Sequence, residues 1–210
     1  MKLILLASSL FIAVTSMAAI PSQVSESYAS QISLAKNAML PMSTRWPALL
    51  KAAELASSQE INEIRAFTQS SDWYMRNAAM AALSQISPDY GIEMAKKLIH
   101  DKALVVRSAA IDLLATKQTI ENRHLLANEL SKPYNFKGRQ SLWVRPQIIR
   151  HLASKATADD RHFFAKQLFD RDPIINEISA NTLEKITDVT FTGKNQLSQW
   201  KSYVQANGWL

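Results

Sequence analysis

The sequence predicts an all-α protein, a solenoid of about five helix pairs closed by a C-terminal capping helix. The first observation is a segment of about thirty residues that recurs along the chain, which is typical of stacked helical repeats. The second is that 210 residues contain only four glycines and no sustained alternation of apolar and polar side chains, which favours helices over strands. An apolar content of 47% and a charged content of 20% are ordinary for a folded domain.

Five anchor positions define the repeat. They are separated by 31, 31, 38 and 31 residues, and they are Arg45, Arg76, Arg107, Arg145 and Asn176. Leu or Ala stands seven residues after each anchor, and a small or apolar residue stands three after it in most copies, so these positions share one helix face. We interpret the arginines as structural, because a guanidinium group can bind the carboxylate or carbonyl groups of a neighbouring turn. Asp72 and Asp172 are the expected partners.

Each pair is expected to consist of a first helix, a turn and a second helix. The second helices are expected at 46–57, 74–86, 105–117, 143–155 and 174–186. The first helices are expected at 27–39 and after caps at Ser58, Ser87, Thr119 and Thr157. Pro47 is expected in the first turn of its helix, where a missing N–H group is tolerated. Segment 191–210 contains a last amphipathic helix at 195–207, which we expect to cover the open end of the stack.

The N-terminal segment has the three parts of a secretory signal peptide. Lys2 supplies the positive charge, residues 3–14 form an apolar run, and small residues follow. We expect cleavage after Ala18, with cleavage after Ala19 as the close alternative. Residues 1–18 are then removed, and 19–26 is a flexible start before the repeats at 27–190. The run is shorter than the roughly 20 residues of a spanning helix. The sequence therefore predicts export, with a periplasmic location in a bacterium, and no transmembrane segment in the mature chain.

The fourth repeat contains an insertion of seven residues, and basic and aromatic side chains alternate in it. We take these as candidate partner-binding residues: Lys132, Tyr134, Phe136, Lys137, Arg139 and Trp143. A loop that departs from repeat geometry is commonly a site of binding specificity. The other interpretation is that the aromatic rings simply pack against the edge of the solenoid, and the sequence leaves both open.

Other chemistries find little support in the sequence. The net charge of +6 permits acidic partners, but the residues five after each anchor form no continuous basic track, so we predict no nucleic-acid binding. There are no cysteines, no Gly-x-Ser-x-Gly motif and no phosphate-binding glycine loop. His124 and His162 occupy equivalent positions without a third ligand at helical spacing. We therefore predict no catalytic residues, no cofactor and no metal.

The repeat resembles a known family in its turn and second helix. Asp72 to Arg76 with Ala79 and Leu83 looks like the HEAT-repeat consensus, and Asp172-Pro173-Ile174-Ile175 resembles the Asp-Pro form of the same turn. The short period is similar to that of the compact HEAT-like class found in phycobilin lyases and many bacterial proteins. Trp200 and Trp209 are similar to the end segment of some secreted bacterial HEAT proteins. The resemblance covers residues 27–190 and implies a right-handed α-solenoid, but no particular activity.

These observations favour an exported scaffold or adaptor that binds another protein through its concave face and the 132–143 loop. Two alternatives stay open at this point. One is an enzyme or accessory lyase-like protein built on the same repeats, and the other is a structural envelope protein that associates with itself. The sequence does not specify the partner or the oligomeric state.

Overall fold

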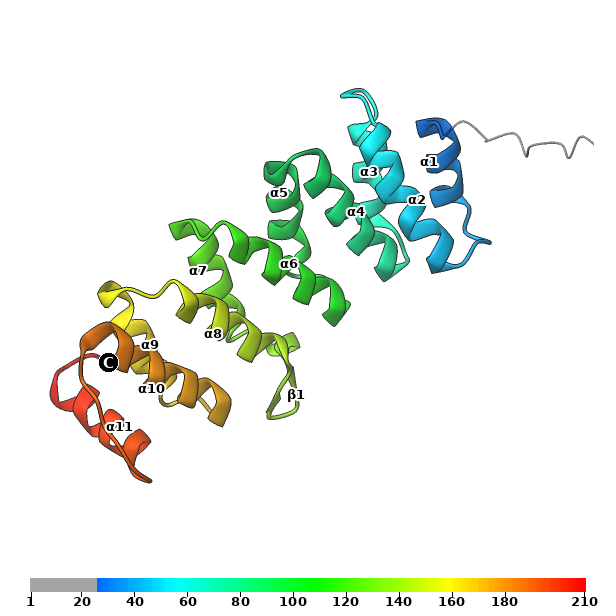
Figure 1. Cartoon of the computed structure of the whole chain (residues 1–210). Helices are drawn as coiled ribbons and strands as arrows, with labels where there is room; N and C mark the ends of the chain where they lie inside the picture. The colour runs from blue at the N-terminus through cyan, green and yellow to red at the C-terminus, as the bar shows by residue number, and fades with distance from the viewer. Residues whose placement is uncertain (1–25) are drawn as a thin grey trace, which may run out of the picture.

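The computed structural model describes residues 26–210, which form an all-α domain (Figure 1). The predicted signal peptide 1–18 and nearly all of segment 19–26 lie outside the described residues. The helices of the described part are α1 (Tyr28–Lys36), α2 (Met42–Leu55), α3 (Ile61–Ala66), α4 (Trp73–Ile86), α5 (Pro88–Leu98), α6 (Leu104–Thr116), α7 (Ile120–Glu129), α8 (Val144–Ser154), α9 (Arg161–Gln167), α10 (Pro173–Thr187) and α11 (Gln196–Ala206). Two-residue strands, β1 (Phe136–Lys137) and β2 (Gln140–Ser141), lie between α7 and α8.

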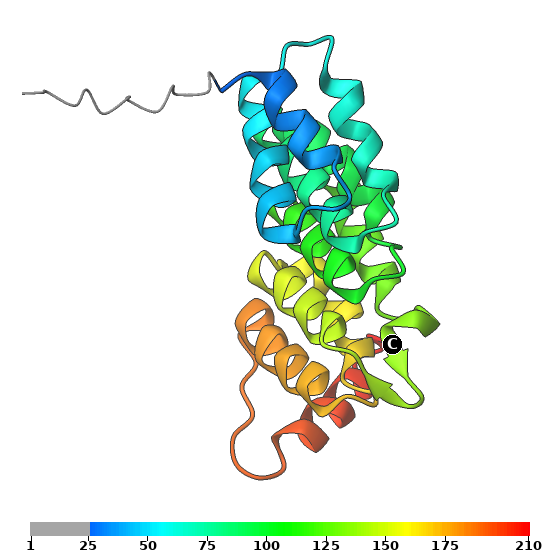
Figure 2. The same ribbon diagram turned by 90° about the vertical axis from the view of Figure 1, so that its right-hand side faces the viewer.

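The helices are arranged as successive antiparallel pairs along an elongated body (Figures 1 and 2). The even-numbered helices α2 to α10 form one layer, in which each helix contacts the next. The odd-numbered helices α1 to α9 form the other layer, and each packs against the even-numbered helix that follows it. Because neighbours in space are neighbours in sequence, the anchors of successive pairs are brought into line.

The core lies between the two layers and follows the positions that the repeat singled out. In α6 these are Val106, Ala110 and Leu114, all 0% exposed, one residue before, three after and seven after Arg107. The equivalent positions of α4, α8 and α10 are also buried. Burying a leucine such as Leu114 contributes roughly 1.5–3 kcal/mol, so these positions contribute strongly to the stability of the packed layers. The periodicity that predicted the helices is therefore the periodicity of the core.

Local sequence explains where several helices begin. The side chains of Ser27, Ser87 and Thr119 each accept a hydrogen bond from a free backbone N–H of the first turn. Thr157 and Asp160 form a reciprocal capping box at the start of the fifth pair. The predicted cap at Ser58 is wrong: α3 starts at Ile61, and the Glu60 carboxylate accepts from the Ser57 amide instead.

Two further expectations need correction. Pro47 is not in a first turn, because α2 starts at Met42 and places Pro47 inside the helix. The helix nevertheless continues, with Ala48, Leu49 and Ala52 buried on its inner face. The insertion, expected as an irregular loop, contains the β1–β2 hairpin. Gly138 in its turn has φ +63°, a conformation that glycine adopts without strain.

The C-terminal helix α11 packs against α10. Trp200 and Val204 of α11 are fully buried, and Phe191 and Tyr203 pack edge-to-face against the Trp200 ring. Gly208, with φ +66°, lets the chain reverse after the helix. None of the helices within residues 26–210 is long and apolar enough to cross a membrane.

Candidate functional site

The anchor residues lie on the even-numbered helices with their polar groups buried between pairs. Arg45, Arg76, Arg107 and Arg145 are only 3–5% exposed. Each guanidinium group reaches the turn that precedes the next even-numbered helix. The acceptors there are Asp72 for Arg45, Asp101 for Arg76, Asn135 for Arg107 and Asp170 for Arg145. This confirms Asp72 as a partner and makes the arginine column a structural element.

The Arg76–Asp101 pair has the most symmetric geometry. Nε and Nη2 of Arg76 donate to the two carboxylate oxygens of Asp101, both at 2.6 Å, and Nη1 donates to the Ser70 and Ser71 carbonyl groups. Burial by itself raises the pKa of Asp101, but the hydrogen bonds from Arg76 and the Ala103 amide outweigh burial and hold that pKa below its usual value. The same pairing raises the pKa of Arg76. The pair is therefore charged and held in one geometry.

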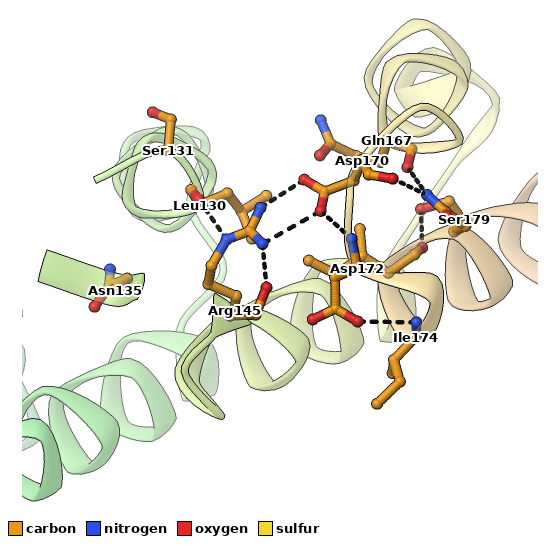
Figure 3. Close-up of polar contacts among 12 residues, drawn as sticks. Leu130, Ser131, Asn135, Arg145, Gln167, Asp170, Asp172, Ile174 and Ser179 are labelled. Carbon is orange, nitrogen blue, oxygen red and sulfur yellow. Dashed lines mark hydrogen bonds and ion pairs between the residues drawn. The ribbon is translucent and has the colours of Figure 1, made fainter. Parts of the chain in front are cut away.

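The Arg145 node corrects the predicted role of Asp172 (Figure 3). Arg145 donates to Asp170 at 2.5 and 3.2 Å, to the Leu130 carbonyl at 2.6 Å, and to the Ser141 hydroxyl. Asp172 instead caps α10, where its carboxylate accepts from the Ile174 amide at 3.0 Å. Asp170 stands two residues earlier, at the bend of the turn, and only the folded turn shows which of the two carboxylates faces the guanidinium group.

Asn135 supplies the acceptor that the fourth pair lacks in its sequence pattern. Its side chain, 1% exposed, accepts from Nε of Arg107 at 3.1 Å and donates to the Glu129 carbonyl at 2.9 Å. Nη2 of Arg107 donates to the Tyr134 carbonyl at 2.9 Å. The insertion therefore carries the missing acceptor, so it takes part in joining the third pair to the fourth.

Asn176 departs from the arginine column for a structural reason. It lies on α10, after which the described chain continues into the single helix α11 rather than another pair. Its amide donates to the Gln167 and Asp170 carbonyl groups of its own pair, at 3.0 and 2.9 Å. An uncharged side chain satisfies these carbonyls and buries no charge.

The candidate partner-binding residues of the insertion separate into two groups. The Tyr134 hydroxyl donates to Glu129 at 2.8 Å, and its ring lies 5.2 Å from the Arg107 guanidinium carbon. Burial, followed by this hydrogen bond, raises the pKa of Tyr134 to about 12. The Phe136 ring, half-buried, lies 4.2 Å from the guanidinium carbon of Arg145. These two rings pack on the anchor arginines, with one edge left accessible.

The other members of the set lie further out. Lys132 is half-buried, whereas Lys137, Arg139 and Trp143 are exposed, Trp143 to 56%. Arg139 and Trp143 line a groove of about 490 Å³ between the hairpin, α8 and the start of α10. The groove is also lined by Gln140, Ser141, Pro146, Arg150, Arg171, Asp172, Pro173 and Ile174. The structure thus brings two predicted residues together with side chains from two other elements.

This groove combines exposed apolar side chains with an excess of positive charge. Trp143 and Ile174, 56% and 44% exposed, supply apolar surface, and Arg139, Arg150 and Arg171 supply three guanidinium groups. Within residues 26–210 these three arginines have no ion-pair partner, and the only carboxylate in the lining, Asp172, is engaged in capping α10. An acidic group entering the groove would therefore meet free donors suited to bidentate carboxylate binding.

Sequence reasoning missed Arg150, Arg171 and Ile174 as members of this site. Arg150 stands five residues after its anchor, in the row that forms no continuous basic track, and Arg171 lies in the turn before α10. A partial signal existed, because Trp143 and Ile174 both stand two residues before an anchor. An alignment of the residues that stand two positions before each anchor would have placed Trp143 and Ile174 in the same column.

The histidines do not gather into a site. His162 lies near the Trp209 carbonyl, His151 pairs with Asp112, and His124 lines a separate groove between α7 and α9. Across the part of the chain that the structure describes, no three acidic or histidine side chains are clustered as a metal site requires.

Comparison with known proteins gives no further guidance for this geometry. No family model matches the sequence, and no curated protein is significantly similar to it.

Proposed function

We propose that this protein is an exported adaptor that binds an acidic segment of another protein in the groove between the hairpin, α8 and α10. The observation that carries the proposal is a set of three arginines around the exposed Trp143 ring, Arg139, Arg150 and Arg171, which have no ion-pair partner among residues 26–210. Tryptophan and arginine carry a disproportionate share of binding energy at protein interfaces.

The proposal includes a HEAT-like, right-handed solenoid of about five pairs as the scaffold. Support comes from the pairwise packing of the helices and from the four anchor arginines, each of which binds the turn of the following pair. Such a scaffold presents a rigid surface, and the hairpin is fixed to it by Asn135 and Ser141. A preorganised groove loses less conformational entropy when a partner binds.

The proposal places the protein in the periplasm of a bacterium. Support comes from the charged start, apolar run and small residues of segment 1–18. N-terminal sequencing of protein from the cell envelope should give Ala19 or Ile20 as the first residue. Recovery of the chain from the cytoplasm with Met1 and Lys2 intact would contradict export.

The binding test uses envelope extract and two matched double variants. Arg139→Ala with Trp143→Ala removes one charge and one aromatic ring from the groove. Ile120→Ala with Arg161→Ala removes an apolar residue that is 77% exposed and an exposed arginine from the other layer. We expect the groove variant to lose most of the partner that wild type captures, because hot-spot residues cost at least about 2 kcal/mol each when truncated. The control should capture as wild type does.

The charge of the partner is tested by ionic strength. Exposed charges separated by more than about 8 Å are largely screened at 0.15 M salt, and screening increases at higher salt. Capture should therefore weaken as salt is raised, and added poly-glutamate should compete for the groove. Equal capture by both double variants, or capture that is indifferent to salt and poly-glutamate, would contradict the proposal.

A further inference from the structure

The groove between the hairpin, α8 and α10, called the arginine groove from here on, is lined by the starts of two helices that offer it few backbone donors. Pro146 stands in the first turn of α8, and Pro173 is the first residue of α10. Proline has no backbone N–H group. The N–H group of Ile174 already donates to the carboxylate of Asp172 at 3.0 Å. Although helix N-termini often bind anions, an anion in this groove therefore depends mainly on the arginine side chains.

The two helix starts present apolar surface to the groove instead. Trp143 immediately precedes α8 and is 56% exposed, and Ile174, the second residue of α10, is 44% exposed. Pro173 is also exposed, whereas Pro146 is buried, and all four residues line the groove. Because α8 and α10 pack against each other (Figure 1), these side chains form one apolar patch between neighbouring helix starts.

Three arginine side chains join this patch from three different elements. Arg139 lies in the turn of the hairpin, Arg150 in α8 and Arg171 in the turn before α10. Each lacks an ion-pair partner among residues 26–210, so each can donate two parallel hydrogen bonds to a carboxylate. Donors from three elements around one apolar lining allow acidic residues to bind on more than one side of a central apolar side chain.

The size of the groove shows that a carboxylate alone would not fill it. Its volume is about 490 Å³, within the range of about 300–1,000 Å³ that is typical of ligand-binding pockets. A carboxylate would leave the side chains of Trp143 and Ile174 in water. A large apolar side chain would remove surface of both from water, which is favourable roughly in proportion to the area removed.

We propose that the arginine groove takes one large apolar side chain of the partner against Trp143 and Ile174, while acidic residues beside it in the partner's sequence bind the arginines. This inference rests on the proposed function, since it identifies a second feature that the same acidic segment must carry. The recognised unit is short and consists of a leucine-like or aromatic residue between acidic residues. An acidic segment without such an apolar residue binds this groove more weakly.

The repeat supplies a matched control position for this inference. Val105 stands two residues before its anchor and second in its helix, α6, as Ile174 does in α10. The two side chains are 41% and 44% exposed. Val105 does not line the arginine groove. Val105→Ala and Ile174→Ala therefore remove comparable apolar surface from equivalent helix starts, and only the second change alters the groove.

The experiment uses the purified protein and three synthetic peptides that carry fluorescein on the same Gly-Ser linker. The leucine peptide, Glu-Asp-Leu-Asp-Glu, has both features. The serine peptide, Glu-Asp-Ser-Asp-Glu, keeps the charge and loses the apolar side chain. The uncharged peptide, Gln-Asn-Leu-Asn-Gln, keeps the leucine and loses the charge. Fluorescence anisotropy at neutral pH gives each Kd, with the labelled linker alone as the blank.

The leucine peptide should bind at least about fivefold more tightly than the serine peptide, because full burial of a leucine corresponds to more than about tenfold in affinity and an open groove leaves part of the side chain in water. Ile174→Ala should reduce this ratio to below about twofold without changing the Kd of the serine peptide, and Trp143→Ala should also reduce it. Val105→Ala should keep the wild-type ratio. Added salt should weaken binding of both peptides and preserve their ratio, since screening acts on charges and not on apolar burial.

Two results separate this inference from the proposed function. Equal affinities for the leucine and serine peptides, or a ratio that Ile174→Ala leaves intact, would show that the groove recognises charge alone. The inference would then fail while the proposed function stands. If the leucine peptide binds no more tightly than the uncharged peptide and Arg150→Ala changes neither Kd, the proposed function fails and this inference fails with it.

Discussion

Arg145 and Arg150 lie five residues apart on α8 and have opposite environments. Arg145 is 3% exposed and donates to Leu130, Ser141 and Asp170. Arg150 is exposed, lines the groove and has no ion-pair partner within the described chain. The same side chain therefore joins two helix pairs at one position and is available to a ligand at the other. Position in the repeat, rather than residue type, separates the structural arginines from the candidate binding arginines.

The insertion shows the same division over a shorter distance. Asn135 and Ser141 bind anchor arginines, and the Tyr134 and Phe136 rings pack on them. Arg139 and Trp143 project into the groove. The residues at the base of the hairpin pack on the solenoid, as one interpretation of the insertion expects, whereas those at its turn and exit are the candidates for the proposed binding site. A test of binding should alter the second group alone.

The largest effect is expected from Arg145→Ala. Removing the guanidinium group leaves Asp170, 14% exposed at its side chain, and the Leu130 carbonyl without their donors. Breaking a buried ion pair by removing one partner costs about 3–5 kcal/mol. Arg150→Ala should change the free energy of unfolding by less than about 0.5 kcal/mol, as an exposed substitution does. Urea denaturation measures the free energy of unfolding of both variants. A similar decrease for the two would show that Arg145 and Arg150 do not differ in their contribution to stability.

The next effect concerns Asp101 and has a defined pH dependence. Asp101→Asn should lower the free energy of unfolding at pH 7 by roughly 1.5–3 kcal/mol, the value of hydrogen bonds to a charged group. The pKa of Asp101 is depressed in the folded state below about 3.9, its value in an unfolded chain. The carboxylate therefore contributes stability above that pH and loses it as the pH falls through the folded pKa.

The wild-type free energy of unfolding should accordingly decline on acidification, and the Asp101→Asn variant should decline less. Asp159→Asn, at an exposed carboxylate outside the anchor column, is the matched control and should follow the wild-type profile. Denaturant titrations at a series of pH values below 5 provide the comparison. Parallel profiles for wild type and Asp101→Asn would show that the Arg76 pair is not the source of the acid dependence.

The smallest effect separates the two aromatic residues of the insertion. Tyr134→Phe removes the hydrogen bond to the buried Glu129 carboxylate and should cost about 1 kcal/mol. Trp143→Ala, at a side chain that is 56% exposed, should change stability by no more than about 0.5 kcal/mol while weakening capture of the partner. Thermal and urea unfolding measure the first difference. A loss of stability for Trp143→Ala well above this value would show that the Trp143 ring packs against the fold.

Most of the helices were predictable from the sequence because their evidence is local. The 31-residue period and the buried positions around Arg107 follow from side chains three, four and seven residues apart, which share a helix face. Ser87 and Thr119 act within one turn of the helices that they cap. The insertion was also visible, since it lengthens one interval to 38 residues. Helix type, core face and insertion were therefore determined by the sequence alone.

The partners of the anchors and the members of the groove were decided by tertiary structure. Each arginine binds an acceptor 25 to 28 residues further on, at an offset that changes from pair to pair. No fixed spacing therefore distinguishes Asp170 from Asp172, or identifies Asn135 in place of a carboxylate. Arg139, Arg150 and Arg171 converge for the same reason: packing of α8 against α10 places turns and helix faces together that local periodicity treats separately. Contacts within a helix are set by the chain, whereas contacts between pairs depend on how the pairs pack.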